Sequence, residues 1–197
     1  MATEPLPDAP AGRRRTRVGA LVVVVLIAIA LVVVGIDQGT KALALAGLTE
    51  GVPVQIVGTL LEFDLQRNAG AAYSLGAGYT WIFAIVAIAV VVFIFVFIRR
   101  IRSLAWATVF GLLLGGTLGN LGDRLFRDPG FGTGHVVDFI MFPWLGFTCN
   151  VADIAITAAV VMLVVLTLLG VGFDGVRRTK APTAAGAERA GDGDDAA

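Results

Sequence analysis

Residues 18–36 read VGALVVVVLIAIALVVVGI, a run of nineteen residues without one charge. At a rise of 1.5 Å per residue, a helix of this length reaches roughly 28 Å, close to the ~30 Å hydrocarbon thickness of a bilayer. In lipid the backbone must satisfy its own hydrogen bonds, so these β-branched residues are predicted to form a helix despite their strand propensity. The run therefore predicts a membrane-spanning helix.

Three further stretches have the same apolar character: residues 80–98, 104–121 and 154–173. The whole chain of 197 residues is 57% hydrophobic and 15% charged, whereas a soluble domain carries about 25% charged residues. A water-facing globular domain is thereby excluded. We expect a mainly α membrane protein, a bundle of four transmembrane helices.

Basic residues lie before the first span, in the short turn between the second and third, and after the fourth. The two other connections, residues 37–79 and 122–153, are longer and mix their few basic residues with acids. The positive-inside rule therefore predicts that both termini are cytoplasmic and both long connections extracytoplasmic. The flanking basic residues are Arg13, Arg14, Arg15, Arg17, Arg99, Arg100, Arg102, Arg177, Arg178 and Lys180.

The N-terminal region also imitates a cleavable secretion signal, because an apolar run precedes the small-residue stretch ALALA at 42–46. The run is longer than the 7–15 residues of a signal core, and Asp37 and Lys41 intervene, so a retained span is favoured. We expect a membrane domain at 18–173 between disordered cytoplasmic tails at 1–17 and 174–197. The tails are rich in small and polar residues that bury little apolar surface.

The first long connection has strand character. Residues 53–57 and 60–66 are β-prone and are separated by Gly58 and Thr59. The second of these segments partly alternates apolar with polar residues, which is typical of a half-buried strand. We therefore expect a small extracytoplasmic β-sheet, at about residues 52–67, between the first two spans.

Unusual polar residues gather at the outer ends of the spans. Ionisable groups near hydrocarbon are costly and suggest function. A structural explanation exists for single residues, since Asp153 would also suit a helix cap. It fits Asp138 less well, because this acid lies in the apolar string VVDFI, residues 136–140. The residues of this set are Asp37, Lys41, Asn68, Asn120, Asp123, Arg124, Asp138, Asn150 and Asp153.

Two carboxylates brought together would support proteolysis. At ~4 Å and an effective dielectric near 20 they repel by roughly 4 kcal/mol, so the pair holds one proton at neutral pH. The charged partner then takes a proton from water while the neutral partner donates one to the substrate. This chemistry needs no metal and no cofactor. Spacing alone does not exclude Asp123 from such a pair.

Other nucleophiles and other classes of function remain as alternatives. Ser74 with Lys41 would make a Ser–Lys dyad, and Cys149 with His135 a thiol pair. A transporter or channel would place ionisable residues near the midplane, but the central turns of all four spans are uncharged. A structural membrane protein would need no acid pair. Fifteen basic and fifteen acidic residues cancel, so no net field recruits nucleic acid.

Five sequence blocks occur in one order around the four spans. They read DQGTK at 37–41, NAGAAYS at 68–74, GGTLGNLGDR at 115–124, VVDF at 136–139 and NVAD at 150–153. With these blocks, residues 18–173 resemble the prolipoprotein signal peptidases, the signal peptidase type II family. Cys149 departs from the family's usual aromatic residue at its position, and the interval between Asp138 and Asp153 is short for the family.

The resemblance implies an aspartic endopeptidase of the bacterial plasma membrane that acts at its extracytoplasmic face without cofactor or metal. It would remove signal peptides from diacylglyceryl-modified prolipoproteins, cleaving before the lipidated cysteine. Its partners would be these precursors and membrane lipid, with no nucleic acid, and a monomer is expected. The outer sheet would cradle the substrate.

The resemblance also implies the roles of individual residues. Asp138 and Asp153 would be the catalytic pair, and Asp123 would be a supporting residue beside Asn120 and Arg124. Arg124 is left with two roles, pairing with Asp123 or holding a substrate carbonyl. The remaining structural or substrate-positioning residues would be Asp37, Lys41, Asn68, Gly70 and Asn150.

Gly111, Gly115 and Gly119 form a stripe of small residues along the third span. Such a stripe is typical of close helix packing. A second hypothesis is that these glycines line a narrow groove that selects small substrate side chains, in which case Gly115→Leu would impair processing without unfolding the protein.

Overall fold

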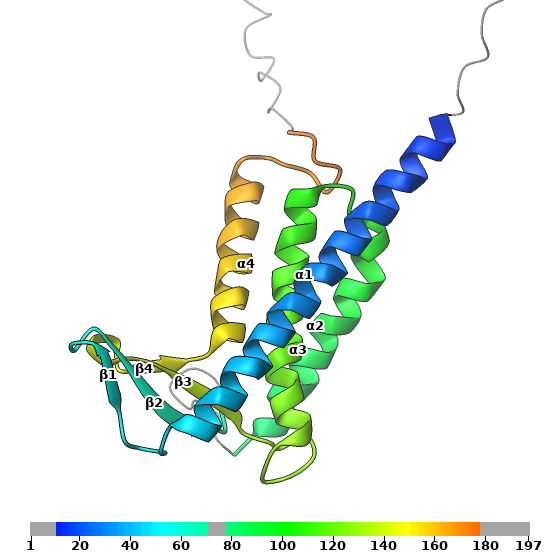
Figure 1. Ribbon diagram of the computed structural model, residues 1–197. Coiled ribbons are helices and arrows are strands. Elements are labelled where there is room, and N and C mark those ends of the chain that lie inside the picture. The colour runs from blue at the N-terminus through cyan, green and yellow to red at the C-terminus, as the bar shows by residue number, and fades with distance from the viewer. Residues whose placement is uncertain (1–10, 71–77, 178–197) are drawn as a thin grey trace, which may run out of the picture.

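Four long helices form the body of the molecule (Figure 1). The structure is a computed structural model that describes residues 11–70 and 78–177, with side chains from residue 19 onward. All four helices are long and apolar enough to cross a membrane, so the predicted membrane bundle is confirmed. They are α1 (Ala11–Gly47), α2 (Thr80–Phe97), α3 (Leu104–Phe126) and α4 (Val151–Leu168).

Three helices extend further at the outer end than the apolar runs predicted. α1 continues past residue 36 to Gly47, α3 continues past residue 121 to Phe126, and α4 begins at Val151 rather than at residue 154. Most polar residues expected in the connections therefore lie on helical turns. These turns stay helical beyond the apolar runs because their polar side chains bond to one another within the protein. At its other end α4 stops at Leu168 instead of residue 173.

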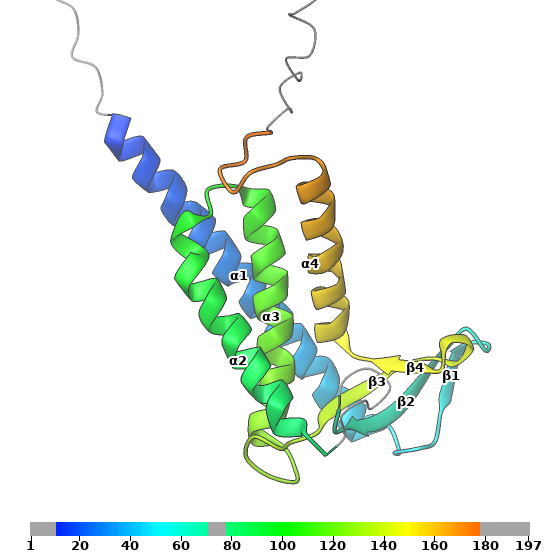
Figure 2. The same ribbon diagram turned by 180° about the vertical axis from the view of Figure 1, so that it is seen from behind.

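A four-stranded antiparallel sheet with the order β1-β2-β3-β4 projects sideways from one end of the bundle (Figure 2). β1 (Val54–Val57) and β2 (Leu61–Asn68) come from the connection between α1 and α2, as predicted. β3 (Val136–Phe142) and β4 (Phe147–Cys149) come from the connection between α3 and α4 and were not predicted. Residues 136–139 are all buried, so β3 lacks the alternation that identifies a half-buried strand.

The sheet and the described chain ends lie at opposite ends of the bundle (Figure 1). Residue 11 and residue 177 lie at one end, where the short helix η2 (Ile98–Arg100) also joins α2 to α3. Arg99 and Arg100 therefore lie far from the sheet. Arg178, Lys180, Ser74 and most of the two predicted tails fall outside the described residues.

The glycine stripe of α3 packs against α1. A Cβ atom added at Gly115 would lie 2.6 Å from the Cβ of Val33 and 2.8 Å from the carbonyl oxygen of Ala30. Gly111 meets α1 in the same way, and Gly119 faces the carboxylate of Asp37. The groove hypothesis is therefore wrong: the stripe is covered by another helix and is not open to a substrate.

Gly115→Ala should destabilise the bundle, because the added methyl group would meet backbone and a branched side chain that cannot swing away. The matched control is Gly122→Ala on the same helix, where nothing lies within 4 Å of the added atom. That control should be neutral or slightly stabilising, since alanine favours a helix over glycine by roughly 0.5–1 kcal/mol. Thermal unfolding midpoints in detergent compare the two variants. Equal midpoints would contradict the close α1–α3 contact.

Candidate active site

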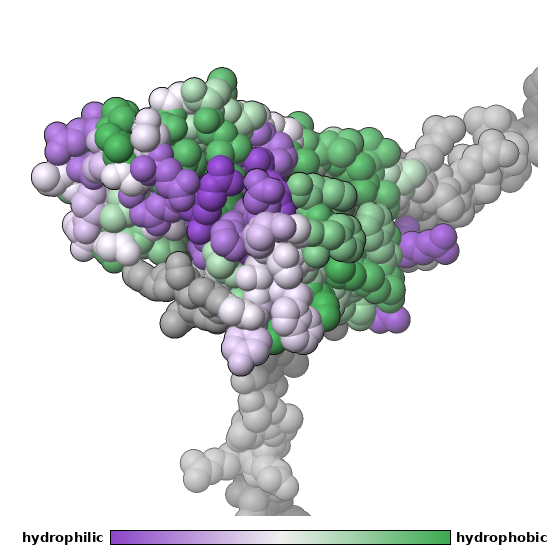
Figure 3. Space-filling model, turned by 90° about the horizontal axis from the view of Figure 1, so that it is seen from below, coloured by the Kyte–Doolittle hydropathy of each residue, from purple (hydrophilic) through white to green (hydrophobic). Residues whose placement is uncertain are grey.

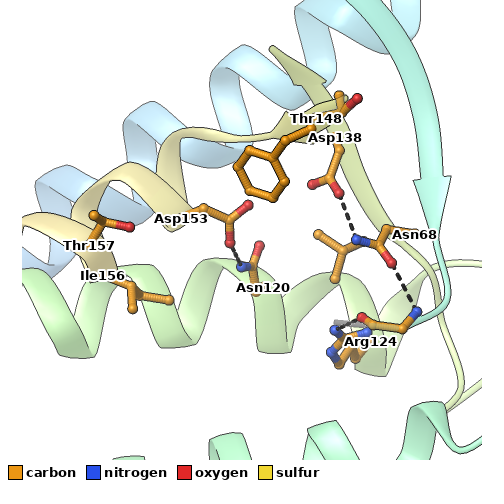
Figure 4. Close-up of a pocket in the computed structure, with 11 residues that line it drawn as sticks. Asn68, Asn120, Arg124, Asp138, Thr148, Asp153, Ile156 and Thr157 are labelled. Atoms are coloured by element: carbon orange, nitrogen blue, oxygen red, sulfur yellow. Dashed lines mark hydrogen bonds between the residues drawn. The ribbon is translucent and has the colours of Figure 1, made fainter. Parts of the chain in front are cut away.

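A cavity of about 240 Å³ lies where the sheet meets the outer ends of α3 and α4. Asp138 enters it from β3 and Asp153 from α4, and the two carboxyl groups face the same space (Figure 4). Seen from this end, hydrophilic residues gather over the middle of the surface beside the hydrophobic flank of the helices (Figure 3). The lining residues are Asn68, Gly70, Asn120, Arg124, Val136, Asp138, Phe147, Thr148, Asp153, Ile156 and Thr157.

Asp138 is buried between apolar neighbours, with 3% of its surface exposed. Its Oδ1 accepts a hydrogen bond from Asn150 Nδ2 at 2.7 Å, and its Oδ2 accepts one from Asn68 Nδ2 at 2.9 Å. Burial raises the pKa of Asp138 to about 6, and the negative charge of Asp153 adds to this rise. The two amide donors act in the opposite direction without cancelling it. Asp138 therefore holds a proton far more readily than an exposed aspartate.

Asp153 lies in the first turn of α4 and completes its N-terminal cap. Its backbone N–H donates to Asn150 Oδ1 at 3.0 Å, and its Oδ2 accepts from the Asn150 backbone N–H at 3.1 Å. This reciprocal pair is a capping box. The remaining oxygen, Oδ1, accepts from Asn120 Nδ2 at 2.8 Å. Asp153 thus caps a helix and also presents a carboxylate to the cavity. The structural explanation of this residue as a helix cap therefore does not exclude a functional one.

Asn150 is fully buried and contacts both acids. Its Oδ1 is occupied by the Asp153 backbone N–H, so its Nδ2 must point the other way, where it donates to Asp138. The same Nδ2 also lies 3.1 Å from Asn120 Oδ1. One side chain thereby fixes β3, α3 and α4 around a common point.

Lys41 organises the layer behind the cavity and is completely buried. Its Nζ lies 2.9 Å from Asp37 Oδ2, 2.7 Å from Asp123 Oδ2 and 2.9 Å from Asn120 Oδ1. The ammonium group has three hydrogens and meets three acceptors. Because Asn120 accepts from Lys41 through its oxygen, its amide nitrogen is turned toward Asp153.

Asp37 and Asp123 connect elements and do not line the cavity. Asp37 Oδ1 accepts from the backbone N–H of Ala152 at 2.9 Å, which joins α1 to the start of α4. Asp123 Oδ2 accepts from the backbone N–H of Val137 at 3.2 Å, which joins α3 to β3. With both its oxygens occupied by ion pairs and hydrogen bonds, Asp123 is not placed to share a proton with either cavity acid.

Gln38 and Arg127 also belong to this network, although neither was among the residues predicted from the sequence. Gln38 Nε2 donates to Gly119 O at 3.0 Å and to Asp123 Oδ1 at 3.2 Å. Arg127 pairs with Asp123 one helical turn away. Two sequence signals could have identified them. Gln38 directly follows Asp37, and Arg127 lies four residues after Asp123, which is one helical turn away.

Arg124 lies in the cavity wall, with 8% of its surface exposed. Its Nη2 donates to the Gly70 carbonyl at 2.8 Å, and its guanidinium carbon lies 5.2 Å from the centre of the Phe83 ring. Its Nη1 is buried and has no hydrogen-bond partner within the part of the chain that the structure describes. Among the described residues Arg124 forms no ion pair with Asp123, so the first of its two expected roles is not found. Gly70 in turn donates its N–H to Asn68 Oδ1 at 2.9 Å.

The alternative nucleophiles are poorly placed. Cys149 is buried, which together with the charges of Asp153 and Asp138 raises its pKa to about 12. Cys149 pairs with Ile140 across the sheet, and His135 lies five residues before Ile140, about 16 Å along the strand at 3.3 Å per residue. Lys41 is held in ion pairs, and Ser74 lies outside the described residues. Within residues 11–70 and 78–177, no cluster of three or more His, Cys, Asp or Glu side chains forms a metal site.

A family model for signal peptidase (SPase) II matches residues 29–169 of the chain. The lipoprotein signal peptidase of Leifsonia xyli subsp. xyli is 47% identical over 178 residues, which cover 90% of this chain and 82% of that protein. The lipoprotein signal peptidase of Mycobacterium tuberculosis strain H37Rv is 42% identical over 175 residues, covering 89% of this chain and 83% of that protein.

Two solved structures are similar in fold as well as in sequence. One is a bacterial membrane enzyme solved by the in meso method at 2.3 Å resolution, with a TM-score of 0.66 and 29% identity over 79% of this chain and 94% of that chain. The other is a bacterial membrane enzyme solved by the same method at 1.9 Å, with a TM-score of 0.63 and 30% identity over 73% and 92% of the two chains.

Lys41→Met should destabilise the protein by roughly 3–5 kcal/mol, because it leaves the carboxylates of Asp37 and Asp123 buried without their shared cation. Arg67→Met is the matched control. Arg67 pairs with Glu50 at 3.3 Å, but these side chains are 38% and 57% exposed, and such surface pairs contribute about 0–1 kcal/mol. Unfolding midpoints in one detergent provide the comparison. A Lys41 variant as stable as the control would contradict a structural role for the buried network.

Asp138→Asn should stabilise the fold increasingly as pH rises. The folded pKa of Asp138, about 6, exceeds its ordinary value of 3.8, so the wild type loses stability as pH rises through 6, and the variant does not. Between pH 4 and pH 8 the advantage of the variant should grow by up to roughly 3 kcal/mol, at 1.36 kcal/mol per pKa unit. Unfolding midpoints across this range measure it, with the exposed Asp128→Asn as control. An advantage that is constant with pH would count against the burial of a titrating carboxyl at residue 138.

Proposed function

The chain belongs to the signal peptidase II family of bacterial membrane proteases, and from this premise we propose that it removes signal peptides from diacylglyceryl-modified prolipoproteins. The cut would fall before the lipidated cysteine. Asp138 and Asp153 would be the catalytic residues of an aspartic endopeptidase. The observation that carries this proposal is that a buried carboxylate and a half-buried one, from different elements, face one cavity and both accept hydrogen bonds from Asn150, Asp138 from its side-chain amide and Asp153 from its backbone N–H.

The pair shares one proton in this mechanism. Asp153 is the charged partner, because the start of α4 and the Asn120 amide donate to its oxygens. Asp138 is the protonated partner, because burial and the neighbouring charge favour its neutral form. Asp153 therefore acts as the general base and Asp138 as the general acid.

The reaction begins with a water molecule between the two carboxyl groups. Asp153 removes a proton from this water, and the water oxygen forms a bond to the scissile carbonyl carbon. At the same time Asp138 donates its proton to the carbonyl oxygen. Breakdown of the tetrahedral intermediate cleaves the C–N bond. Asp153 returns its proton to the leaving amine, and Asp138 recovers one from the hydroxyl. The products are a free signal-peptide carboxylate and the amino group of the lipid-bearing cysteine.

In this proposal Arg124 holds a substrate carbonyl, which is the second of the two roles expected from the sequence. The unpartnered Nη1 lies in the cavity wall and donates a hydrogen bond to a backbone carbonyl of the bound precursor. A buried donor without a partner is costly, so binding the substrate would relieve that cost. The contact of Arg124 with Gly70 and that of Gly70 with Asn68 fix the loop that holds the Asn68 amide against Asp138.

The position of the cavity suits a substrate that is itself anchored in a membrane. The cavity lies at the end of the bundle opposite the basic residues of η2, which under the positive-inside rule supports a site at the extracytoplasmic face with both termini in the cytoplasm. A signal helix lying beside the bundle would bring its lipid-modified end to the same depth. Both proposed catalytic acids belong to the same chain, so the proposed mechanism needs no second copy.

Asp138→Asn and Asp153→Asn should each reduce cleavage of a diacylated precursor by at least a thousandfold, because neither variant retains an acid and a base. The purified protein and a synthetic lipidated precursor are the components of the assay, with unfolding midpoints confirming that the variants are folded. Cys149→Ala is the control and should keep near-normal activity. If both aspartate variants still cleave, the aspartic mechanism is wrong, and an inactive Cys149→Ala would restore the thiol alternative. A transport or purely structural role predicts that even the wild type does not cleave.

A further inference from the structure

A second cavity, of about 430 Å³, adjoins the catalytic one. Phe147, Asp153 and Thr157 line both, so the two spaces meet at the proposed general base. Apart from Asp153 and Thr157, the walls of the second cavity are apolar or carry only the buried thiol. Its lining residues are Phe142, Trp144, Leu145, Phe147, Cys149, Asp153, Ile154, Thr157 and Ala158.

The second cavity opens toward hydrocarbon. One wall is the short helix η3 (Pro143–Leu145), which joins β3 to β4, and the other is the outer turn of α4. Trp144 is 65% exposed and Ile154 50% exposed. The apolar surface continues along α4 at Val160 and Val161. Because α4 is one of the membrane-spanning helices, the cavity mouth lies at the edge of the bilayer, where a tryptophan is favoured.

We infer that this cavity, called here the acyl pocket, takes one acyl chain of the diacylglyceryl group during cleavage; the inference rests on the proposed function. The glyceryl group is attached to the residue directly after the scissile bond. If the scissile carbonyl of the substrate lies beside Asp153, the lipid is therefore only a few bonds away from the wall that the two cavities share. An unbranched chain in the acyl pocket buries apolar surface on both partners, which is favourable.

The signal helix is a poorer occupant. It lies on the other side of the scissile bond from the lipid. The geometry thus assigns the acyl pocket to the lipid and leaves the lipid-exposed surface of the bundle to the signal helix.

Ala158 is the position that tests the assignment. It is half-buried on α4 and lines the acyl pocket but not the catalytic cavity. Ala158→Phe would narrow the acyl pocket while leaving the side chains of both proposed catalytic acids unchanged. Ala89→Phe on α2 makes the same change at an exposed position away from both cavities and is the matched control.

The first experiment compares precursors with two palmitoyl chains and with two butanoyl chains. Ala158→Phe should lower kcat/KM at least tenfold for the palmitoyl precursor, mainly through KM, and less than threefold for the butanoyl precursor. Ala89→Phe should match the wild type on both. Equal losses on both precursors, or no loss on either, would overturn the assignment. A wild type that cleaves neither precursor refutes the proposed function instead.

The second experiment does not depend on cleavage. The inactive Asp138→Asn variant is mixed with a precursor that carries a photoreactive diazirine near the end of one acyl chain, and crosslinks are mapped by mass spectrometry. Crosslinks to 142–147 and 154–158 are expected, and Ala158→Phe should reduce them. Crosslinks confined to α1 or α2 would overturn the assignment. So would crosslinks to the acyl pocket from a diazirine on the signal peptide instead of the lipid.

Discussion

The structure depends on one buried ammonium group. Lys41 Nζ meets Asp37, Asp123 and Asn120 within 2.9 Å, with no exposed surface on the lysine. Two carboxylates at this depth would repel each other and resist dehydration unless a cation lay between them. Through Asp37 the ion network reaches the start of α4, and through Asp123 it reaches β3. The two elements that carry the cavity acids are thus positioned from the same point.

The same arrangement gives the four acids two different kinds of surroundings. Asp37 and Asp123 lie against cations and backbone donors, where their charge is compensated. Asp138 and Asp153 receive amide hydrogen bonds but no direct ion pair among the described residues. The two carboxyl groups therefore interact electrostatically, and the negative charge of Asp153 contributes to the raised pKa of Asp138. Acids of one chemical type thereby differ in their electrostatic environment because of their neighbours alone.

The membrane explains why the site is built at the end of the bundle. Peptide hydrolysis needs water and ionisable groups, and both are costly in hydrocarbon. Extra turns of α1 and α3 carry polar residues beyond the apolar spans, and the sheet closes over them. The cavity that holds Asp138 and Asp153 is polar, while the adjoining pocket proposed for an acyl chain is apolar and opens beside α4. A substrate that is half peptide and half lipid matches these two environments.

The sequence by itself determined the four spans, the first two strands and the set of polar residues, because hydropathy, alternation and the cost of charge in lipid act locally along the chain. The motif blocks also indicated the family. Only the tertiary structure decided which acids meet, since Asp123 and Asp153 lie equally far from Asp138 in sequence, yet Asp123 is turned toward Lys41 and Asp153 faces the cavity. It alone separated Cys149 from His135, paired β3 with β2, and covered Gly115 with α1. These outcomes depend on contacts between elements distant in sequence, and no local pattern encodes the direction in which a side chain meets a neighbouring helix or strand.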